Sequence, residues 1–524
     1  MSKNKSWGGT ASRLPMFKDF VPEWLRLPLL IVLPFIYQCS NPIYMNIASH
    51  VMSDTALTNE DVMMCGYASI IGITVTFPIL FRLKFRFTTR QIILAASTAI
   101  LILNFIASHC TFMPLLVTVC FLFGIFKVWG TFECMSSMMQ ILTPTMHLAP
   151  FLSVVFMAVF GGVELGGLAS THIAHYHDWH YVSLALAVVH LVVILEALLL
   201  LQDVRFRPPM KLYGIDWLGM LLWGIFLLAL TAVLVYGERL DWFHSTVVNI
   251  CMGIAFLSLA ANIWRINHLR HPLVESACFR YHNLLNIIVI FFISGVMLSS
   301  QNVLQHLLTN SLLHYEPLNS VHLNWAVLAG IVAGCLLGHY SLTALGWSYK
   351  QITFASMLFT TMYAASMYFL VSPATGLNDL VIPCFMSGIG HSLLFVVLTT
   401  YVESHTPFEH RFQMLTVLGL VRTGVASPLG ATLYERLFRR SMRHNIALLG
   451  SDVNTGSLLH FSYNEVAQGV VRQAMMVSVK QLFGLTVLMG IVTLLVIALS
   501  HFATRPARTL PMLRWFSLLE RKQA

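Results

Sequence analysis

The sequence predicts an all-α, polytopic membrane protein, and three observations lead to this prediction. Hydrophobic residues make up 57% of the 524 residues and charged residues only 10%, with a mean hydropathy of +0.74. Soluble proteins average about 25% charged residues, so no water-soluble fold would bury this much apolar surface. Apolar runs of membrane-spanning length recur along the chain, and the basic residues gather in alternate loops.

The apolar runs number fourteen if each span takes about 20 mainly apolar residues. The fourth and fifth contain polar interruptions, and the ninth has a poorly defined C-terminal end. In chain order the predicted spans are roughly 27–48, 62–81, 92–109, 113–142, 148–173, 181–201, 216–236, 245–264, 283–306, 324–341, 351–371, 378–402, 412–434 and 482–503.

The distribution of Lys and Arg predicts that both termini are cytoplasmic. With the N-terminus inside, the inside segments hold 22 of the 31 Lys and Arg residues, whereas the short outside loops hold only Arg239. The long loop after the thirteenth span holds six more, but the positive-inside rule is weak for long loops near the end of a chain. Topology therefore explains the formal charge of +9 better than nucleic-acid binding does.

A polar linker, Q-D-V-R-F-R-P-P-M-K-L-Y-G-I-D at 202–216, divides the chain. We expect an N-terminal six-helix bundle over 1–201, and the linker with two inserted transmembrane helices over 202–282. A C-terminal six-helix bundle follows over 283–524, with a long outside loop at about 436–478 and a cytoplasmic tail. Six plus two plus six spans is a transporter layout, in which the substrate site lies between two bundles near the membrane midplane.

The sequence offers little support for an enzyme. It has no nucleotide-binding G-x-x-x-x-G-K-[ST] motif and no nucleophile elbow G-x-S-x-G, and its nine cysteines form no C-x-x-C pair. We therefore expect no cofactor, no metal site, no disulfide and no catalytic residues.

Several stretches resemble, in order along the chain, the fourteen-span drug:proton antiporter branch of the major facilitator superfamily (the EmrB/QacA type). The first is similar to D-x-T-I-V-N-V-A-L, and the second to the antiporter motif G-P-x-x-G-G with its downstream W-x-W-x-F. The resemblance implies the major facilitator fold and proton-coupled export. The stretches are N-P-I-Y-M-N-I-A-S-H-V (41–51), G-G-V-E-L-G-G-L (161–168) with H-D-W-H-Y-V-S-L-A (177–185), Y-G-E-R-L-D-W (236–242), H-P-L-V-E-S-A-C-F-R (271–280) and V-V-R-Q-A-M-M-V-S-V-K-Q-L-F (470–483).

The chain departs from this family pattern at positions that matter for coupling. The first-span Asp of the family falls on Asn41, the Pro of the antiporter motif on Val163, and the Asp of the loop G-x-L-a-D-R-x-G-R-R on Arg82. The fourth-span Arg best matches Lys127. The resemblance therefore implies a divergent member, whose proton site, if it has one, lies elsewhere than Asn41.

Glu164 stands in the middle of the fifth predicted span, where a lone carboxylate costs about 2.5–3.5 kcal/mol on insertion scales. Glu164 and Lys127 each lie about 15 residues, or roughly 22 Å, from the inner ends of adjacent antiparallel spans. We therefore expect an ion pair between them. The motif glycines Gly162, Gly166 and Gly167 would let another helix come close to this point.

Glu133 lies two turns below Lys127 on the fourth span, nearer the cytoplasm. A buried carboxylate gains or loses a proton as a cation withdraws or approaches. Glu133, Glu164 and Lys127 are therefore the candidates for proton coupling. The alternative is a static ion pair that only orients helices.

Other polar residues within spans are candidates for lining a substrate cavity. Arg422 could hold an anionic substrate or pair with a carboxylate across the bundles. The others, each as readily explained by an interhelical hydrogen bond, are Gln38 and Asn41 in the first span and Gln301, Asn302 and His306 in the ninth. The intramembrane histidines His190, His339 and His391 could relay protons, but their spacing does not indicate a metal site.

The predicted function is secondary active, proton-driven efflux of amphipathic drugs or small molecules across the cytoplasmic (inner) membrane. Its partners would be the small-molecule substrate, protons and the lipid bilayer. A periplasmic adaptor protein is left open, and no nucleic acid is expected. One alternative is an importer or a dedicated exporter of a specific metabolite, such as a siderophore or a lipid. A non-transporting receptor or membrane enzyme is a third reading.

Overall fold

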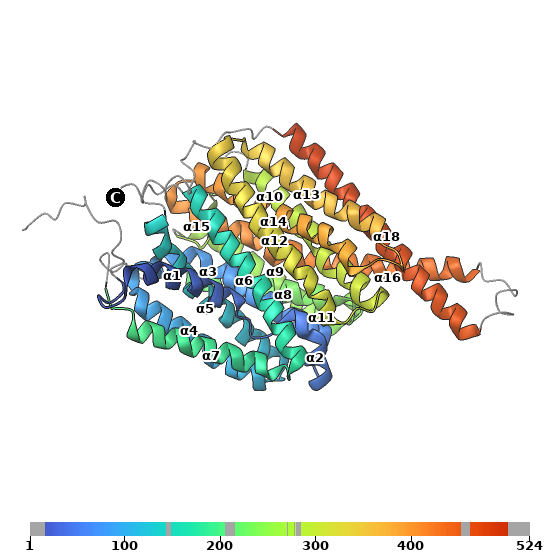
Figure 1. Ribbon diagram of the computed structural model, residues 1–524, viewed down its shortest axis with the longest axis horizontal. Coiled ribbons are helices and arrows are strands. Elements are labelled where there is room, and N and C mark those ends of the chain that lie inside the picture. Colours follow the sequence, from blue (N-terminus) through green and yellow to red (C-terminus); the bar gives the residue numbers. More distant parts are fainter. Residues whose placement is uncertain are drawn as a thin grey trace, which may run out of the picture.

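The chain forms long helices that run side by side in a computed structural model (Figure 1). The structure describes residues 16–142, 148–204, 215–269, 271–276, 278, 284–451 and 462–500. The basic residues before 16, most of the linker and the tail after 500 lie outside these ranges. Phe17 and Leu201 form an isolated antiparallel bridge that ties the start of the N-terminal half to its end.

We call residues 16–204 the N-terminal half and residues 284–500 the C-terminal half. The N-terminal half contains α1 (Glu23–Cys39), α2 (Ala48–Asp54), α3 (Asn59–Arg86), α4 (Thr89–His109), α5 (Met113–Leu142), α6 (Leu148–Tyr176) and α7 (His180–Leu199). The middle segment contains α8 (Trp217–Gly237) and α9 (Thr246–His268). The C-terminal half contains α10 (Leu284–Ser300), α11 (Pro317–Ser320), α12 (His322–Tyr340), α13 (Tyr349–Leu370), α14 (Leu377–His405), α15 (Phe408–Gly419), α16 (Ser427–Ser451) and α18 (Tyr463–Leu499).

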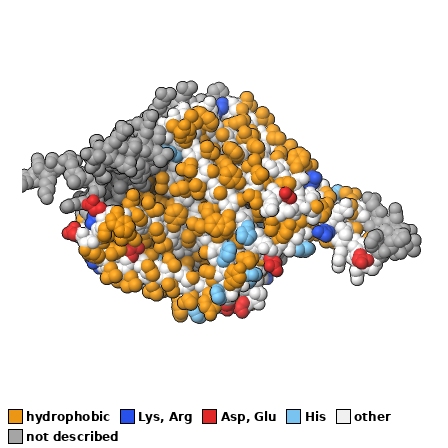
Figure 2. Space-filling view, viewed as in Figure 1, with side chains coloured by type: hydrophobic (Ala, Val, Ile, Leu, Met, Phe, Trp, Pro, Cys, Tyr) orange, Lys and Arg blue, Asp and Glu red, His pale blue; other side chains and the backbone are white. Residues whose placement is uncertain are grey.

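Among the described residues, twelve helices are long and apolar enough to cross a membrane. Hydrophobic side chains cover most of the visible face, and charged ones gather toward its ends (Figure 2). The chain is therefore an all-helical, multi-pass membrane protein. The first predicted span overlaps α1 over its N-terminal part, and the eleventh coincides with α13; neither helix is among the twelve, and α1 has only 17 residues. The count of fourteen stays a prediction.

The first predicted span, 27–48, is interrupted in the structure. α1 ends at Cys39, because Pro42 has no amide hydrogen to donate and disfavours helical backbone at Asn41. The backbone groups freed by the break are satisfied locally. The hydroxyl of Tyr44 donates to the Cys39 carbonyl (2.7 Å) and accepts from the Asn41 amide (3.1 Å).

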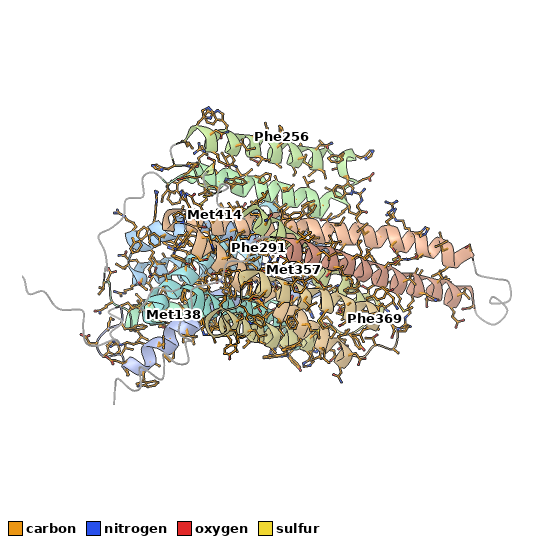
Figure 3. All side chains as sticks on the ribbon, turned by 90° about the horizontal axis from the view of Figure 1, so that it is seen from above. Met138, Phe256, Phe291, Met357, Phe369 and Met414 are labelled. Carbon is orange, nitrogen blue, oxygen red and sulfur yellow. The ribbon has the colours of Figure 1, made fainter. Side chains whose placement is uncertain are left out.

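The two halves have separate hydrophobic cores. One large cluster of buried side chains lies within residues 16–201, and the other within residues 274–497. Phe291 and Met357 lie in the second core, whereas Phe256 projects from α9 at the edge of the molecule (Figure 3). A helix that exposes its apolar face in this way suits contact with lipid.

The middle segment adds one helix between the halves and one outside them. Leu227 of α8 packs with Ile71 and Val75 of α3 and with Leu420 of the C-terminal half. The Tyr236 hydroxyl of α8 donates to Asp61 of α3 at 2.6 Å. α8 therefore touches both halves, whereas α9 packs mainly on α8.

The stretch expected to form a long outside loop is helical over most of its described length. α16 continues to Ser451 and α18 begins at Tyr463, so the two helices form an arm that projects from the molecule (Figure 1). Asn445 is buried between them and donates to Ser478 (2.9 Å) and Gln481 (3.3 Å). Residues 452–461, at the tip, lie outside the described residues.

Candidate functional site

The two halves meet through α6 and α3 of the N-terminal half. α6 of the N-terminal half packs against α12 and α14, and α3 packs against α15 and the turns that follow it. The hydroxyls of Thr74 and Thr423 are 3.3 Å apart across the second contact. In the first contact, the ring of Phe160 lies 4.5 Å from that of His391 and 4.8 Å from that of Phe395. The buried polar groups of the site lie around these contacts.

Lys127 of α5 is buried against the broken end of α1. Its ammonium donates to the Gln38 carbonyl at 3.0 Å and to Asn41 Oδ1 at 3.1 Å. A helix C-terminus presents free carbonyls and a partial negative charge, so it suits a buried cation. The Gln38 side chain donates to Thr131 Oγ1 at 2.9 Å. The sequence-predicted residues Lys127, Gln38 and Asn41 therefore do come together, as one hydrogen-bonded cluster.

The expected ion pair between Lys127 and Glu164 is wrong. Both residues are described, and no ion pair joins them. Equal depth on consecutive helices does not fix which way each side chain faces, and α5 and α6 scarcely touch. Lys127 turns toward the end of α1, whereas Glu164 lies one turn after Phe160 on the side of α6 that meets the C-terminal half.

Glu164 has no hydrogen-bond or ion-pair partner among the described residues. Its side chain is partly buried. The neighbouring glycines face α1. A Cβ atom at Gly162 would lie 2.6 Å from Gln38 Cβ, and one at Gly166 would overlap the Cys39 carbonyl oxygen. These glycines allow α6 to approach α1 closely, and Gly167 does the same for Asn46.

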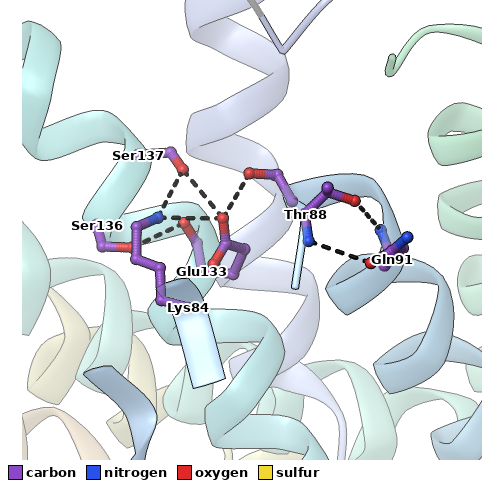
Figure 4. A network of polar contacts seen from close by, with 7 residues as sticks. Lys84, Thr88, Gln91, Glu133, Ser136 and Ser137 are labelled. Carbon is purple, nitrogen blue, oxygen red and sulfur yellow. Dashed lines mark hydrogen bonds and ion pairs between the residues drawn. The ribbon is translucent and has the colours of Figure 1, made fainter. Parts of the chain in front are cut away.

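Glu133 of α5 lies in a separate polar cluster with residues at the end of α3 and the start of α4 (Figure 4). Its Oε1 atom accepts from Lys84 (3.1 Å), from the Thr89 hydroxyl (2.6 Å) and from Ser137 (3.5 Å). Its Oε2 atom is buried without a hydrogen-bond partner among the described residues. Glu133 therefore has a fixed counter-charge, which Glu164 lacks.

Arg422 lies in a segment of wide, π-helical turns, Leu420–Ala426, between α15 and α16. It is 5% exposed, donates to His391 Nε2 at 2.6 Å, and places its guanidinium carbon 3.9 Å from the centre of the Phe395 ring. No carboxylate lies within 4 Å of it in the part of the chain that the structure describes. Turns of this kind are common at functional sites.

A small cavity adjoins Arg422 in the C-terminal half. Its volume is about 20 Å³, which holds about one water-sized group. Gln301 lines it and accepts a hydrogen bond from Ser387. Asn302 and His306, predicted to share this wall, are instead exposed and are not among its lining residues. Asn302 follows Gln301 directly, and consecutive residues of a helix point about 100° apart, so the two side chains do not share a face.

The other histidines do not join this site. His190 is buried and bonds Ser40 Oγ at 3.0 Å within the N-terminal half. Asp54, Asp178 and His180 bring their possible metal-ligand atoms within 4.8 Å of one another, but all three are exposed. A hydrogen bond with His180 holds the pKa of the Asp178 carboxyl below its usual range, so that carboxylate already has a partner.

Sequence reasoning missed several residues that complete these clusters. From the sequence, Lys84 counts among the basic residues of the inside segments, whereas the structure pairs Lys84 with Glu133. The sequence also suggested no role for Ser387 or Phe395. One signal was present: Phe156, Phe160 and Glu164 recur every four residues on α6, which places them on one face of that helix.

Comparison with known proteins defines the family. Residues 30–431 match the model of the Major Facilitator Superfamily. The probable multidrug resistance protein EmrY of Escherichia coli (strain K12) is 23% identical over 389 residues, which cover 69% of this chain and 71% of EmrY. Among solved structures, a POT peptide transporter in complex with sulfate matches with a TM-score of 0.58 and 14% identity, over 93% of this chain and 97% of that chain. The nucleoside transporter NupG matches with a TM-score of 0.51 and 12% identity, over 90% and 98%. The chain therefore belongs to the major facilitator superfamily and is a membrane transporter rather than an enzyme.

Proposed function

We propose that this protein is a secondary active transporter that exports amphipathic small molecules across the cytoplasmic membrane in exchange for protons. It would have fourteen spans, arranged as two six-helix bundles and an inserted pair, with both termini cytoplasmic. The similarity to EmrY supports a role in efflux. The proposal of proton coupling rests on Glu164. This carboxylate lies at the contact between the halves and has no fixed counter-charge among the described residues.

A carboxylate in this position can bind a proton or the basic group of a substrate, but not both at once. Because Glu164 meets the C-terminal half through α6, rocking of the halves would open it to one side of the membrane and then to the other. Competition between proton and substrate, together with alternating access, is sufficient for antiport. Lys127 cannot neutralise Glu164 directly, since its ammonium is committed to the end of α1.

Glu133 is the second carboxylate candidate, and its contacts support a different role. Lys84, Thr89 and Ser137 surround it, so its charge is compensated within the N-terminal half. In this proposal, Glu133 holds the inner ends of α3, α4 and α5 together, and Glu164 exchanges the proton.

The test uses purified protein in liposomes with an imposed pH gradient and ethidium as an amphipathic cation. The wild type should concentrate ethidium against its gradient, and Glu164→Gln should lose this response while still binding ethidium. Glu133→Gln is the matched control, and it should keep the response in whatever fraction of the protein folds. Wild-type rates in Glu164→Gln would exclude Glu164 as the proton site. If Glu133→Gln and the double variant also transport ethidium at wild-type rates, the proton site must lie in the C-terminal half or at a histidine, or another ion must drive transport.

The same liposome assay distinguishes an exporter from an importer. If one metabolite, rather than ethidium, moves in the same direction as the protons, the dedicated importer is the correct reading. Hypersusceptibility of a deletion strain to several amphipathic drugs would support export, and loss of growth on one nutrient would support import.

A further inference from the structure

Arg422 carries a buried charge that the protein does not neutralise within the described residues. An unpaired charge in a low-dielectric interior is costly unless a ligand or a second charge compensates it. The sequence left two readings open, an anionic substrate or a carboxylate across the bundles, and no such carboxylate is within 4 Å. His391 does not supply the charge, because its Nε2 atom accepts a hydrogen bond from Arg422 and is therefore unprotonated.

Most of the hydrogen-bonding capacity of Arg422 is unused among the described residues. A guanidinium has five N–H donors in a planar fork that matches a carboxylate. One donor serves His391, and the guanidinium lines the small cavity beside Gln301 and Ser387. Ser387 donates to the Gln301 amide oxygen, which leaves the Gln301 NH₂ group as a further donor at the cavity wall. The cavity thus joins a cation with a neutral donor, a set that favours an anion.

Apolar side chains adjoin this pocket on the side of the N-terminal half. Phe156 and Phe160 of α6 pack with Phe395 of α14, at ring distances of 5.2 and 4.8 Å. Phe395 also lies under the guanidinium of Arg422. A polar head held by Arg422 would therefore continue into an aromatic cluster formed by both halves.

We propose that Arg422, with Gln301 and Ser387, forms a subsite for the carboxylate of an amphipathic substrate whose apolar part lies against Phe156, Phe160 and Phe395. This inference rests on the proposed function and names the chemical class of one substrate group. Glu164 would receive a basic group and Arg422 an acidic group, so the transporter would accept acidic as well as basic amphiphiles. At about 20 Å³ the cavity holds about one water-sized group, so it must widen for a carboxylate to enter, and Phe160 must move for the rest of the molecule.

The experiment measures binding to the full chain in lipid nanodiscs by isothermal titration calorimetry. Three probes share one aromatic body: 1-naphthoate, 1-naphthalenemethanol and 1-naphthylmethylammonium. The wild type should bind 1-naphthoate more tightly than the alcohol. Arg422→Gln should weaken 1-naphthoate about ten-fold or more, because charge-assisted hydrogen bonds are lost, and should leave the ammonium probe unchanged. Arg422→Lys keeps the positive charge but lacks the planar fork of N–H donors. Its affinity for 1-naphthoate should therefore lie between those of the wild type and Arg422→Gln.

Arg439→Gln is the matched control, since Arg439 is exposed on the projecting arm and pairs with Glu435; it should change none of the three affinities. If Arg422→Gln does not fold, Gln301→Leu and Ser387→Ala replace it, and each should weaken 1-naphthoate selectively. Wild-type affinity for 1-naphthoate in these variants, or no preference for it over the alcohol, would overturn the subsite.

Glu164→Gln should weaken the ammonium probe alone. A failure confined to that arm would count against the proposed function and leave the subsite standing.

Discussion

Lys127 donates a hydrogen bond to Asn41, the residue that falls on the aspartate of the D-x-T-I-V-N-V-A-L motif. Asn41 is neutral, whereas Lys127 is positively charged. The Gln38 carbonyl at the C-terminal end of α1 also accepts a hydrogen bond from the Lys127 ammonium. This arrangement predicts that a carboxylate at position 41 would be held more tightly than the amide.

Asn41→Asp should raise the thermal stability of the protein, because the buried Lys127 ammonium would then have an ionised partner in place of a neutral amide. The gain is expected to be about 1 kcal/mol, measured as a higher apparent melting temperature in detergent. Asn46→Asp, an exposed position nearby, is the control and should give no gain. In a Lys127→Met background, Asn41→Asp should destabilise instead, since the new carboxylate would be buried without a cation. A gain that persists without Lys127 would contradict the assigned contact.

Glu133→Gln should lower stability by about 1–3 kcal/mol, since Lys84 loses its charged partner in a buried cluster. Lys84→Gln should have a similar effect. The double variant should be more stable than the sum of the single losses predicts, by about 0.5–3 kcal/mol for residues in direct contact. Denaturant-induced unfolding of all four proteins checks this prediction, and strictly additive losses would show that the two side chains do not interact in the folded protein.

Asn445→Leu should loosen the arm formed by α16 and α18. Asn445 donates to Ser441, Ser478 and Gln481, and a buried polar residue of this kind specifies the register of paired helices. Limited trypsin digestion should therefore cleave faster at Arg443 and Arg472, while helices in the bilayer stay protected. Ser451→Leu, exposed at the end of α16, is the control. Equal cleavage rates in Asn445→Leu and wild type would show that the polar contacts do not hold the arm together.

Reporter fusions test the fourteen-span topology. Fusions after residues 240 and 455 should report the outside of the membrane, and a fusion at the C-terminus should report the cytoplasm. The physical reason is the strong bias of Lys and Arg toward the predicted inside segments. A C-terminus on the outside would rule out an even number of spans with a cytoplasmic N-terminus.

Much of the helical framework was predictable from hydropathy, because apolar runs near 20 residues have few alternatives to a membrane helix. The interruption of α1 was visible in principle as Pro42, although the predicted span ran through it. The extension of α16 and α18 beyond the predicted spans was missed, since hydropathy marks the apolar part of a helix rather than where the helix ends.

The side-chain partners were much harder to predict. Lys127 and Glu164 lie at similar depth, but depth along a helix does not determine rotation about its axis, and the two residues contact different helices. Asn302 and His306 were expected beside Gln301, but the structure leaves both exposed, and of the three only Gln301 lines the cavity. Which face of a helix meets its neighbours depends on tertiary packing, which a single sequence does not display.

The length of α18 has a mechanical consequence. A straight helix of 37 residues measures roughly 55 Å, well beyond the roughly 30 Å of the hydrocarbon core. Because α18 packs against α13 and α16 of the C-terminal half and continues without interruption into the arm, the arm must tilt whenever that half tilts. It therefore acts as a lever that magnifies small rotations within the bilayer into larger displacements in the aqueous phase. A fluorophore on this lever, paired with one on the outer end of α7, would report the transport cycle from outside the membrane without disturbing the buried contacts.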